Sequence, residues 1–493
     1  MSAWTDAAMT AALGLPANAG GESIQYTGVG TDTRTLRRGD VFVALRGEKH
    51  DGHAFLGVAE ASGATAAVVD SIPEGAPALT YYVVPDTLTA LGQLGRFQRR
   101  RMGVKVCAVA GSNGKTTTKE LLRAVLGGAF HVHATGGNFN NLIGAPLTLL
   151  ATPTGTDVVV SEIGTNTPGE IAKLAGIVEP DAAVITGISE EHLEGLGDLR
   201  GVLREEASVL PWLSPEGTAI VADEPPMLAE HARVLFPSVK VAGLSERADA
   251  ELRGEDVRLD DEGRVSFRWQ GNDVALKLRG MHNARNALLA LGIAQAWGIT
   301  PAAAIANLEA LQPPKMRTEF HRYGDLVVIA DCYNANPASV HAAVDLLASM
   351  PRAGGRVAVL GSMLELGPTS AEIHAQAARD IAGRGFDLII ATGAFVEAFA
   401  PLKDSLGGRL VSESDPLQAW THLEPALSGS EVVLLKGSRG VALERLLPRF
   451  ETKWGLLHPH GEASGPRAAH PATGSRDEGR PAEHPRGSTG EKV

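Results

Sequence analysis

At 493 residues the chain is too long for one ordinary hydrophobic core, so we expect two to four domains. A hydrophobic content of 44% fits a globular protein, and a formal net charge of −12 argues against a non-specific nucleic-acid binder. The chain has only two cysteines, Cys107 and Cys332, which argues against a disulfide framework and favours a cytoplasmic protein. The sequence shows no signal-peptide core and no apolar run near the roughly 20 residues of a membrane span, so we expect no membrane insertion.

The first segment, residues 1–102, alternates short apolar strands with helical stretches. We expect strands at 41–45, 66–69 and 82–84, followed by a helix at 91–102. This alternation predicts a small α/β domain.

Two further α/β domains are expected, at residues 103–311 and 312–456, with Pro313-Pro314 at their boundary. In both, strands alternate with helices, which predicts mostly parallel sheets covered by helices. The expected strands are 106–110, 158–161, 182–186, 219–222, 326–330, 356–360, 388–391 and 431–435. Residues 457–493 contain almost no large apolar side chain, so we expect a disordered tail.

The most specific motif is a short glycine loop between an apolar strand and a helix. Such a loop presents backbone N–H groups and a positive helix end to phosphates, while Lys115 reaches the β- and γ-oxygens and the Thr116 hydroxyl can hold Mg²⁺. A standard P-loop requires glycine where this chain has Val109, so the shorter form favours ATP-dependent amide-bond ligases over common GTPases. The predicted nucleotide-binding residues are Gly111, Ser112, Asn113, Gly114, Lys115, Thr116 and Thr117.

Two more strands end in potential metal ligands. Glu162 closes the strand at 158–161, and His192 follows the strand at 182–186. A strand-end carboxylate is often only a helix cap, and a single histidine more often packs than binds. Because the carboxyl ends of parallel strands share one sheet edge, however, we expect both to meet Thr116 at a Mg²⁺ site.

Four polar residues further along are weaker candidates for the same nucleotide. Asn283 and Asn286 lie three apart on one helix face and could hydrogen-bond an adenine edge, or simply cap the helix and face solvent. Asp331 ends a strand and could bind ribose hydroxyls or an amine, and Arg317 could clamp the γ-phosphate.

With these motifs the chain resembles the Mur ligase family over about residues 25–455. Within the family it is most similar to the type that adds D-alanyl-D-alanine to UDP-N-acetylmuramoyl-tripeptide, and the Asn-Pro-Arg signature of the type that adds the third residue is absent from the sequence. The segments that carry the resemblance are Thr31–Arg34, Gly137–Leu149, Asp331–Pro337, Leu360–Gly367 and Lys436–Gly440.

The resemblance implies three domains that hold a UDP-sugar, ATP and the incoming amine, in a monomer whose closure assembles the site. It implies that Lys115 and Thr116 hold the phosphates and Mg²⁺, and that Glu162 and His192 hold a second Mg²⁺. Asn283 and Asn286 would contact adenine, and Arg317 and Asp331 would complete the nucleotide site. The residues implied for the UDP-sugar and peptide substrates are Thr33, Arg34, Asn138, Asn141, Tyr333, Asn334 and Asn336.

The chain departs from the family pattern at two positions. Many members carry a lysine after the metal-binding histidine, carbamylated by CO₂, and here that position is Glu206, with Glu205 as the alternative if the register shifts by one. We expect the glutamate to supply the metal-binding carboxylate directly. Cys332 stands where the family pattern has serine, and it would make the site sensitive to alkylation.

Other functions remain open at this point. The chain could be another amide ligase of the same superfamily, such as a tripeptide synthetase or a folylpolyglutamate synthase, although the latter lacks the N-terminal UDP-binding domain. It could also be a non-catalytic homologue that binds UDP-sugar precursors; the intact motif residues argue against this.

Overall fold

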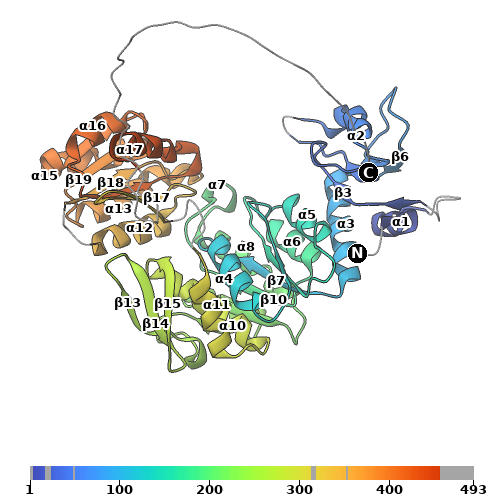
Figure 1. Cartoon of the computed structure of the whole chain (residues 1–493), viewed down its shortest axis with the longest axis horizontal. Helices are drawn as coiled ribbons and strands as arrows, with labels where there is room; N and C mark the ends of the chain where they lie inside the picture. Colours follow the sequence, from blue (N-terminus) through green and yellow to red (C-terminus); the bar gives the residue numbers. More distant parts are fainter. Residues whose placement is uncertain (1–3, 17–23, 48–49, 313–317, 351–353, 456–493) are drawn as a thin grey trace, which may run out of the picture.

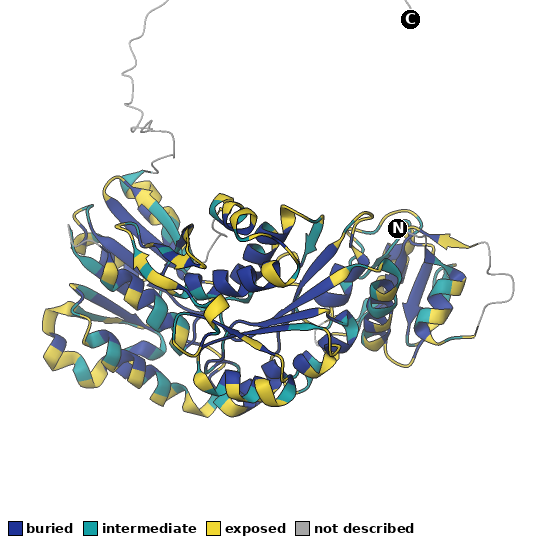
Figure 2. Cartoon of the chain, turned by 90° about the horizontal axis from the view of Figure 1, so that it is seen from below, coloured by how far each residue is buried: buried dark blue, intermediate teal, exposed yellow. Residues whose placement is uncertain are grey.

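The computed structural model describes residues 4–16, 24–47, 50–312, 318–350 and 354–455. Three α/β units lie in a row, with the N-terminal and C-terminal units at opposite ends of the central one (Figure 1). The inner strands of the two large sheets are buried and the outer helix faces are exposed (Figure 2).

The N-terminal unit has a four-stranded parallel sheet in the order β3-β4-β5-β6. Its long helix α3 packs against α5 and α6 of the central unit and so joins the two units. The elements of the unit are β1 (Trp4–Thr5), α1 (Asp6–Leu13), β2 (Gln25–Tyr26), β3 (Val29–Gly30), β4 (Val41–Val43), α2 (Leu56–Ala61), β5 (Ala66–Val69), β6 (Thr80–Val83) and α3 (Thr87–Met102).

The central unit has a six-stranded parallel sheet in the order β12-β11-β10-β7-β9-β8. From β7 the chain builds β8 and β9 on one side and β10 to β12 on the other, so the topological switch point lies at the end of β7, where open α/β sheets bind ligands. The elements are β7 (Lys105–Ala110), α4 (Lys115–Gly127), β8 (Val132–Ala134), α5 (Gly144–Leu150), β9 (Val158–Glu162), α6 (Glu170–Val178), β10 (Ala182–Ile185), α7 (Leu193–Leu196), α8 (Leu199–Ala207), β11 (Thr218–Ala222), α9 (Pro226–Leu235) and β12 (Lys240–Ala242).

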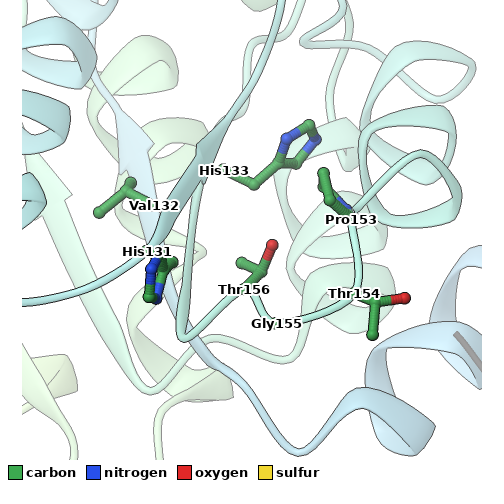
Figure 3. A pocket seen from close by; sticks show the side chains of 7 residues that line it. All are labelled: His131, Val132, His133, Pro153, Thr154, Gly155 and Thr156. Atoms are coloured by element: carbon green, nitrogen blue, oxygen red, sulfur yellow. The ribbon is translucent and has the colours of Figure 1, made fainter.

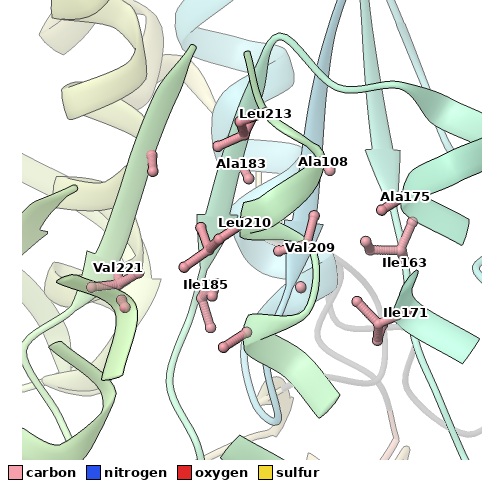
Figure 4. Packing of buried hydrophobic residues seen from close by; sticks show 14 of the residues in the cluster. Ala108, Ile163, Ile171, Ala175, Ala183, Ile185, Val209, Leu210, Leu213 and Val221 are labelled. Carbon is pink, nitrogen blue, oxygen red and sulfur yellow. The ribbon is translucent and has the colours of Figure 1, made fainter. Parts of the chain in front are cut away.

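Both faces of this sheet are buried, which explains its continuous apolar strands. Val106, Ala108 and Ala110 face one core, which includes residues of α6 and of the segment after α8 (Figure 4), while Cys107 and Val109 face the other core against α4. Because successive side chains of β7 point to opposite faces of the sheet, the central unit has two hydrophobic layers, one on each face.

An antiparallel three-stranded sheet completes the second layer, and the sequence analysis missed it. It comprises β13 (Glu255–Leu259), β14 (Arg264–Trp269) and β15 (Asn272–Arg279), followed by α10 (His282–Ala296) and α11 (Pro301–Ala310). Helix α10 is buried between this sheet and α4, so its first turn lies beside the loop that opens α4.

The C-terminal unit has a six-stranded sheet in the order β16-β17-β21-β18-β19-β20, parallel except for β16. Its elements are β16 (Glu319–Tyr323), β17 (Leu326–Asp331), α12 (Pro337–Ser349), β18 (Arg356–Leu360), α13 (Ser370–Ala382), β19 (Leu388–Thr392), α14 (Ala394–Phe399), α15 (Lys403–Leu406), β20 (Leu410–Glu413), α16 (Ala419–Ala426), β21 (Val432–Lys436) and α17 (Leu447–Trp454).

The expected three-domain α/β fold is confirmed, and each expected strand is present within one or two residues at its ends. The domain limits at 102, 311 and 456 stay predictions, and the expected tail at 457–493 lies outside the described residues. Within the described ranges, every helix is too short or too polar to cross a bilayer.

The burial of Cys332 argues against the expected sensitivity of the site to alkylation. Its side chain is 1% exposed, Sγ lies 3.4 Å from the Leu435 carbonyl oxygen, and burial raises the thiol pKa to about 12. Burial also raises the pKa of Cys107.

We expect both thiols to resist iodoacetamide in the native protein and to react in denaturant, because the thiolate is the nucleophile. Rapid native labelling, measured by mass spectrometry, would contradict this.

Candidate active site

The glycine loop, residues Gly111–Gly114, joins β7 to α4 at the switch point of the central sheet. Gly111 has φ 114° and Gly114 has φ 83°, both in the left-handed region that favours glycine. A Cβ on Gly111 would meet Thr186 at 2.5 Å, and one on Gly114 would meet Asn286 at 2.7 Å. The loop can therefore keep its backbone exposed to an anion only with glycine at both positions.

Lys115, the first residue of α4, folds back onto this loop. Its Nζ donates to the carbonyl oxygens of Gly111 and Ser112 and lies 3.6 Å from Glu191 Oε1. A triphosphate in the loop would offer this ammonium group stronger acceptors than carbonyls.

Ser189, in the segment after β10, fixes the shape of the glycine loop. Its backbone N–H donates to Ser112 Oγ at 3.0 Å, and its hydroxyl accepts from Asn113 Nδ2 at 2.7 Å. These hydrogen bonds join the ends of the neighbouring strands β7 and β10.

Thr116 and Glu162 come together as predicted, with the Thr116 hydroxyl 3.2 Å from Glu162 Oε1. Asn140, which the sequence analysis missed in favour of its neighbours Asn138 and Asn141, donates to the same oxygen at 3.0 Å. Glu162 Oε2 is buried and has no hydrogen-bond partner among the described residues. This pair therefore leaves one carboxylate oxygen for a cation.

Glu206 lies directly behind the glycine loop. Its side chain is fully buried, Oε2 accepts from the Gly111 N–H at 2.6 Å, and Oε1 lacks a hydrogen-bond partner among the described residues. Burial raises the pKa of this carboxyl group, and Lys115 opposes the shift. Glu205 instead binds the start of α6 through the N–H groups of Gly169 and Ile171, so the structure favours the register with Glu206 at the loop.

Glu191 is a further buried carboxylate that the sequence analysis missed. Burial raises its pKa to about 7, Lys115 opposes the shift, and Glu206 adds to it. Since the only local signal was the run Ser-Glu-Glu-His, pattern alone could not distinguish it from an exposed acidic residue.

Two side chains of the C-terminal unit contact this site. Glu365 Oε2 lies 2.6 Å from His192 Nδ1. Asn336 Nδ2 donates to Asn113 Oδ1 at 2.9 Å, while its own Oδ1 caps α12 through the Ser339 N–H. The C-terminal unit is thus docked on the glycine loop and on the predicted metal ligand.

The predicted nucleotide contacts also lie near this interface. Asn286 donates to Asn283 Oδ1 at 3.0 Å and packs against Gly114, which places the asparagine pair beside the loop. Asp331 pairs with the buried Lys436 at 2.8 Å. Arg317 lies outside the described residues.

Most of the residues predicted to bind the other substrates lie away from the loop. Thr33 and Arg34 belong to the N-terminal unit, where Arg34 is largely exposed and its guanidinium forms a bidentate ion pair with Asp32. Asn141 accepts from the N–H of Gly144, the first residue of α5, and Asn138 is exposed. Tyr333 and Asn334 are exposed between β17 and α12.

A hollow of about 280 Å³ lies between the start of β8 and the loop before β9 (Figure 3). These are the amino-terminal ends of parallel strands, whereas the glycine loop is at the carboxyl ends. The hollow is therefore not part of the site. It is lined by His131, Val132, His133, Pro153, Thr154, Gly155 and Thr156.

The described side chains fit a Mg²⁺ ion in part. Within the described ranges, no three His, Cys, Asp or Glu side chains form a ready-made metal cluster. Glu162 and Glu206 each nevertheless leave one buried oxygen without a hydrogen-bond partner there. This suits Mg²⁺, which commonly uses one or two carboxylates and takes its other ligands from water and phosphate.

The three α/β units, the glycine loop and its acidic surroundings fit the class of ATP-dependent amide ligases, and the similarity to known proteins supports this class. Three family profiles match the chain: Mur ligase family, catalytic domain, at residues 25–99; Mur ligase middle domain at 109–294; and Mur ligase, glutamate ligase domain, at 316–439. A UDP-N-acetylmuramoyl-tripeptide–D-alanyl-D-alanine ligase from Bacillus subtilis (strain 168) is 36% identical over 88% of this chain and 95% of its own length. The chain belongs to the Mur ligase family.

Solved structures agree with this assignment. MurF from Acinetobacter baumannii matches with a TM-score of 0.83 and 30% identity over 92% of this chain and all of that one. MurF ligase from Thermotoga maritima, in complex with ADP, matches with a TM-score of 0.76 and 26% identity over 86% of this chain and 97% of that one.

Proposed function

We propose that the chain adds D-alanyl-D-alanine to UDP-N-acetylmuramoyl-tripeptide, with conversion of ATP to ADP and phosphate through an acyl phosphate. The observation that carries the proposal is the glycine loop, with Lys115 and the Thr116–Glu162 pair at the point where the C-terminal unit docks. The full-length similarity to the Bacillus subtilis ligase supports this substrate pair. A cytoplasmic monomer remains our expectation.

The reaction requires two displacements. The terminal carboxylate of the tripeptide attacks the γ-phosphorus, giving an acyl phosphate and ADP. The amine of the dipeptide then attacks the acyl carbon, and phosphate leaves as the amide forms. The loop N–H groups and Lys115 would neutralise the phosphate charge, and the docked C-terminal unit would exclude water that hydrolyses the acyl phosphate.

Thr116 would hold one Mg²⁺ at the phosphates, and Glu162, His192 and Glu206 would supply the ligands of a second; when bound, these ions neutralise phosphate charge. The chain's own residues then have separate tasks. Asn140 orients Glu162 through its Nδ2, and Gly111 fixes Glu206 through its N–H. Asn283, Asn286, Arg317 and Asp331 are the proposed contacts to the nucleoside and γ-phosphate, while Thr33, Arg34, Asn138, Asn141, Tyr333, Asn334 and Asn336 are the proposed contacts to the UDP-sugar and peptides.

A folylpolyglutamate synthase is the less favoured alternative. The N-terminal unit, which matches the Mur family profile at residues 25–99, has no role in that reaction. A non-catalytic homologue is disfavoured because Lys115, Thr116 and Glu162 are present and correctly grouped.

The test is release of ADP by the purified protein. We expect ADP only when UDP-N-acetylmuramoyl-tripeptide and D-alanyl-D-alanine are both present, with one amide formed per ADP. Turnover with tetrahydrofolate and glutamate instead would identify the synthase, and nucleotide binding without turnover would identify the non-catalytic homologue. Tripeptides ending in lysine, ornithine or diaminopimelate would then define the third residue.

A further inference from the structure

We propose that Glu365, on the C-terminal unit, is a positioning residue that orients the imidazole of His192 and so couples docking of this unit to metal binding. The inference rests on the proposed role of His192 as a metal ligand. Its basis is the 2.6 Å separation between Glu365 Oε2 and His192 Nδ1.

This contact determines which ring nitrogen is available. An ionised carboxylate can only accept at 2.6 Å, so Nδ1 carries a proton, and in the neutral imidazole Nε2 then keeps its lone pair. Nε2 lies on the side of Glu191, 4.0 Å from its Oε2, and Glu191 in turn lies beside Lys115. A histidine that donates one N–H to a carboxylate and presents the other nitrogen is the usual arrangement around protein-bound metals.

The backbone at both ends of the pair is held in an uncommon conformation. Glu365 has φ 63° and His192 has φ 51°, in a region that non-glycine residues seldom adopt. Such strain persists only where the surroundings impose it, and it concentrates at functional sites.

The loop that carries Glu365 is anchored on both sides. The N–H of Met363 donates to His374 Nε2 at 2.9 Å, and that of Leu364 donates to Ser438 Oγ at 3.0 Å. Beyond Glu365, a Cβ on Gly367 would lie 3.2 Å from the Glu194 backbone, so the loop rests directly on α7, which follows His192. Figure 1 shows α7 at the edge of the central unit that faces the C-terminal unit.

Stability alone does not explain the contact. The Glu365 side chain is 60% exposed, and ion pairs this open to water contribute little to folding. The pair forms only when the two units are docked, because its partners belong to different units. If the C-terminal unit were not docked, the His192 imidazole would therefore lose the carboxylate that orients it.

The test is Mn²⁺ affinity, measured by electron paramagnetic resonance on full-length protein with a non-hydrolysable ATP analogue and UDP-N-acetylmuramoyl-tripeptide. We expect Glu365→Ala to weaken Mn²⁺ binding about tenfold, the lower range for loss of a residue that orients a metal ligand. Glu365→Gln should lose less because its amide oxygen still accepts from Nδ1. Glu372→Gln, an exposed carboxylate in the first turn of α13, is the matched control and should bind as wild type.

His192→Ala separates this inference from the proposed function. If His192→Ala weakens binding but Glu365→Ala does not, the positioning role fails and the metal role of His192 stands. Tighter binding by Glu365→Ala would show that the carboxylate competes with the metal, which also overturns the inference. If His192→Ala binds as wild type, the metal set of the proposed function is wrong.

Discussion

Lys115→Ala is expected to lower the rate of ADP release about a thousandfold while the protein stays folded. Phosphoryl transfer depends on preorganised positive charge, and loss of one such group commonly costs this much. In the described structure Lys115 Nζ lies among loop carbonyls and Glu191, so the ammonium group is already held at the loop proposed to bind the phosphates. The measurement is steady-state ADP release with both peptide substrates saturating.

Lys173→Ala is the matched control for this change. Lys173 is an exposed lysine on α6, and its loss should leave the rate within about twofold of wild type because surface substitutions away from special features have small effects. The prediction fails if Lys115→Ala retains more than about a tenth of the wild-type rate, since electrostatic stabilisation of the expected size would then be absent.

The central strands of the parallel sheets could be predicted because they are short apolar runs buried on both faces. Val158 to Val160 and Val432 to Leu435 are examples in which burial and sequence agree. The β13–β15 sheet was missed although Val265, Phe267 and Trp269 alternate with polar residues, the pattern of a strand with one buried face. This period of two lies within a segment whose dominant pattern is a repeated strand–loop–helix unit, which predicts only parallel strands.

The site was predictable where function lies in one local motif, and not where distant segments meet. The glycine loop and the Thr116–Glu162 pair follow from strand ends that share one sheet edge. Asn140, Glu191 and Glu365 reach the site through turns and docking whose geometry no spacing rule fixes. Asn336 is predicted to contact substrate, but both ends of its side-chain amide already have partners. Its Oδ1 accepts from the Ser339 N–H at the start of α12, and its Nδ2 donates to Asn113 Oδ1.

Glu206→Gln is expected to lower the rate about a hundredfold and to raise the Mg²⁺ concentration needed for half-maximal activity. Glutamine retains the size of the side chain and can still accept from the Gly111 N–H, so the loop should keep its shape while the buried negative charge is lost. Because glutamate replaces the lysine of the family pattern here, activity should also be unchanged when dissolved CO₂ is removed.

Glu205→Gln provides the comparison one residue away. Glu205 accepts from the N–H groups that open α6, so this change should cost about 1 kcal/mol of stability, as loss of a helix-terminal carboxylate does, without altering the Mg²⁺ requirement. Equal rates and equal Mg²⁺ requirements in Glu206→Gln and wild type would remove Glu206 from the metal set. The buried Glu206 carboxylate would then act only on the glycine loop, by accepting from the Gly111 N–H and by its electrostatic interaction with Lys115.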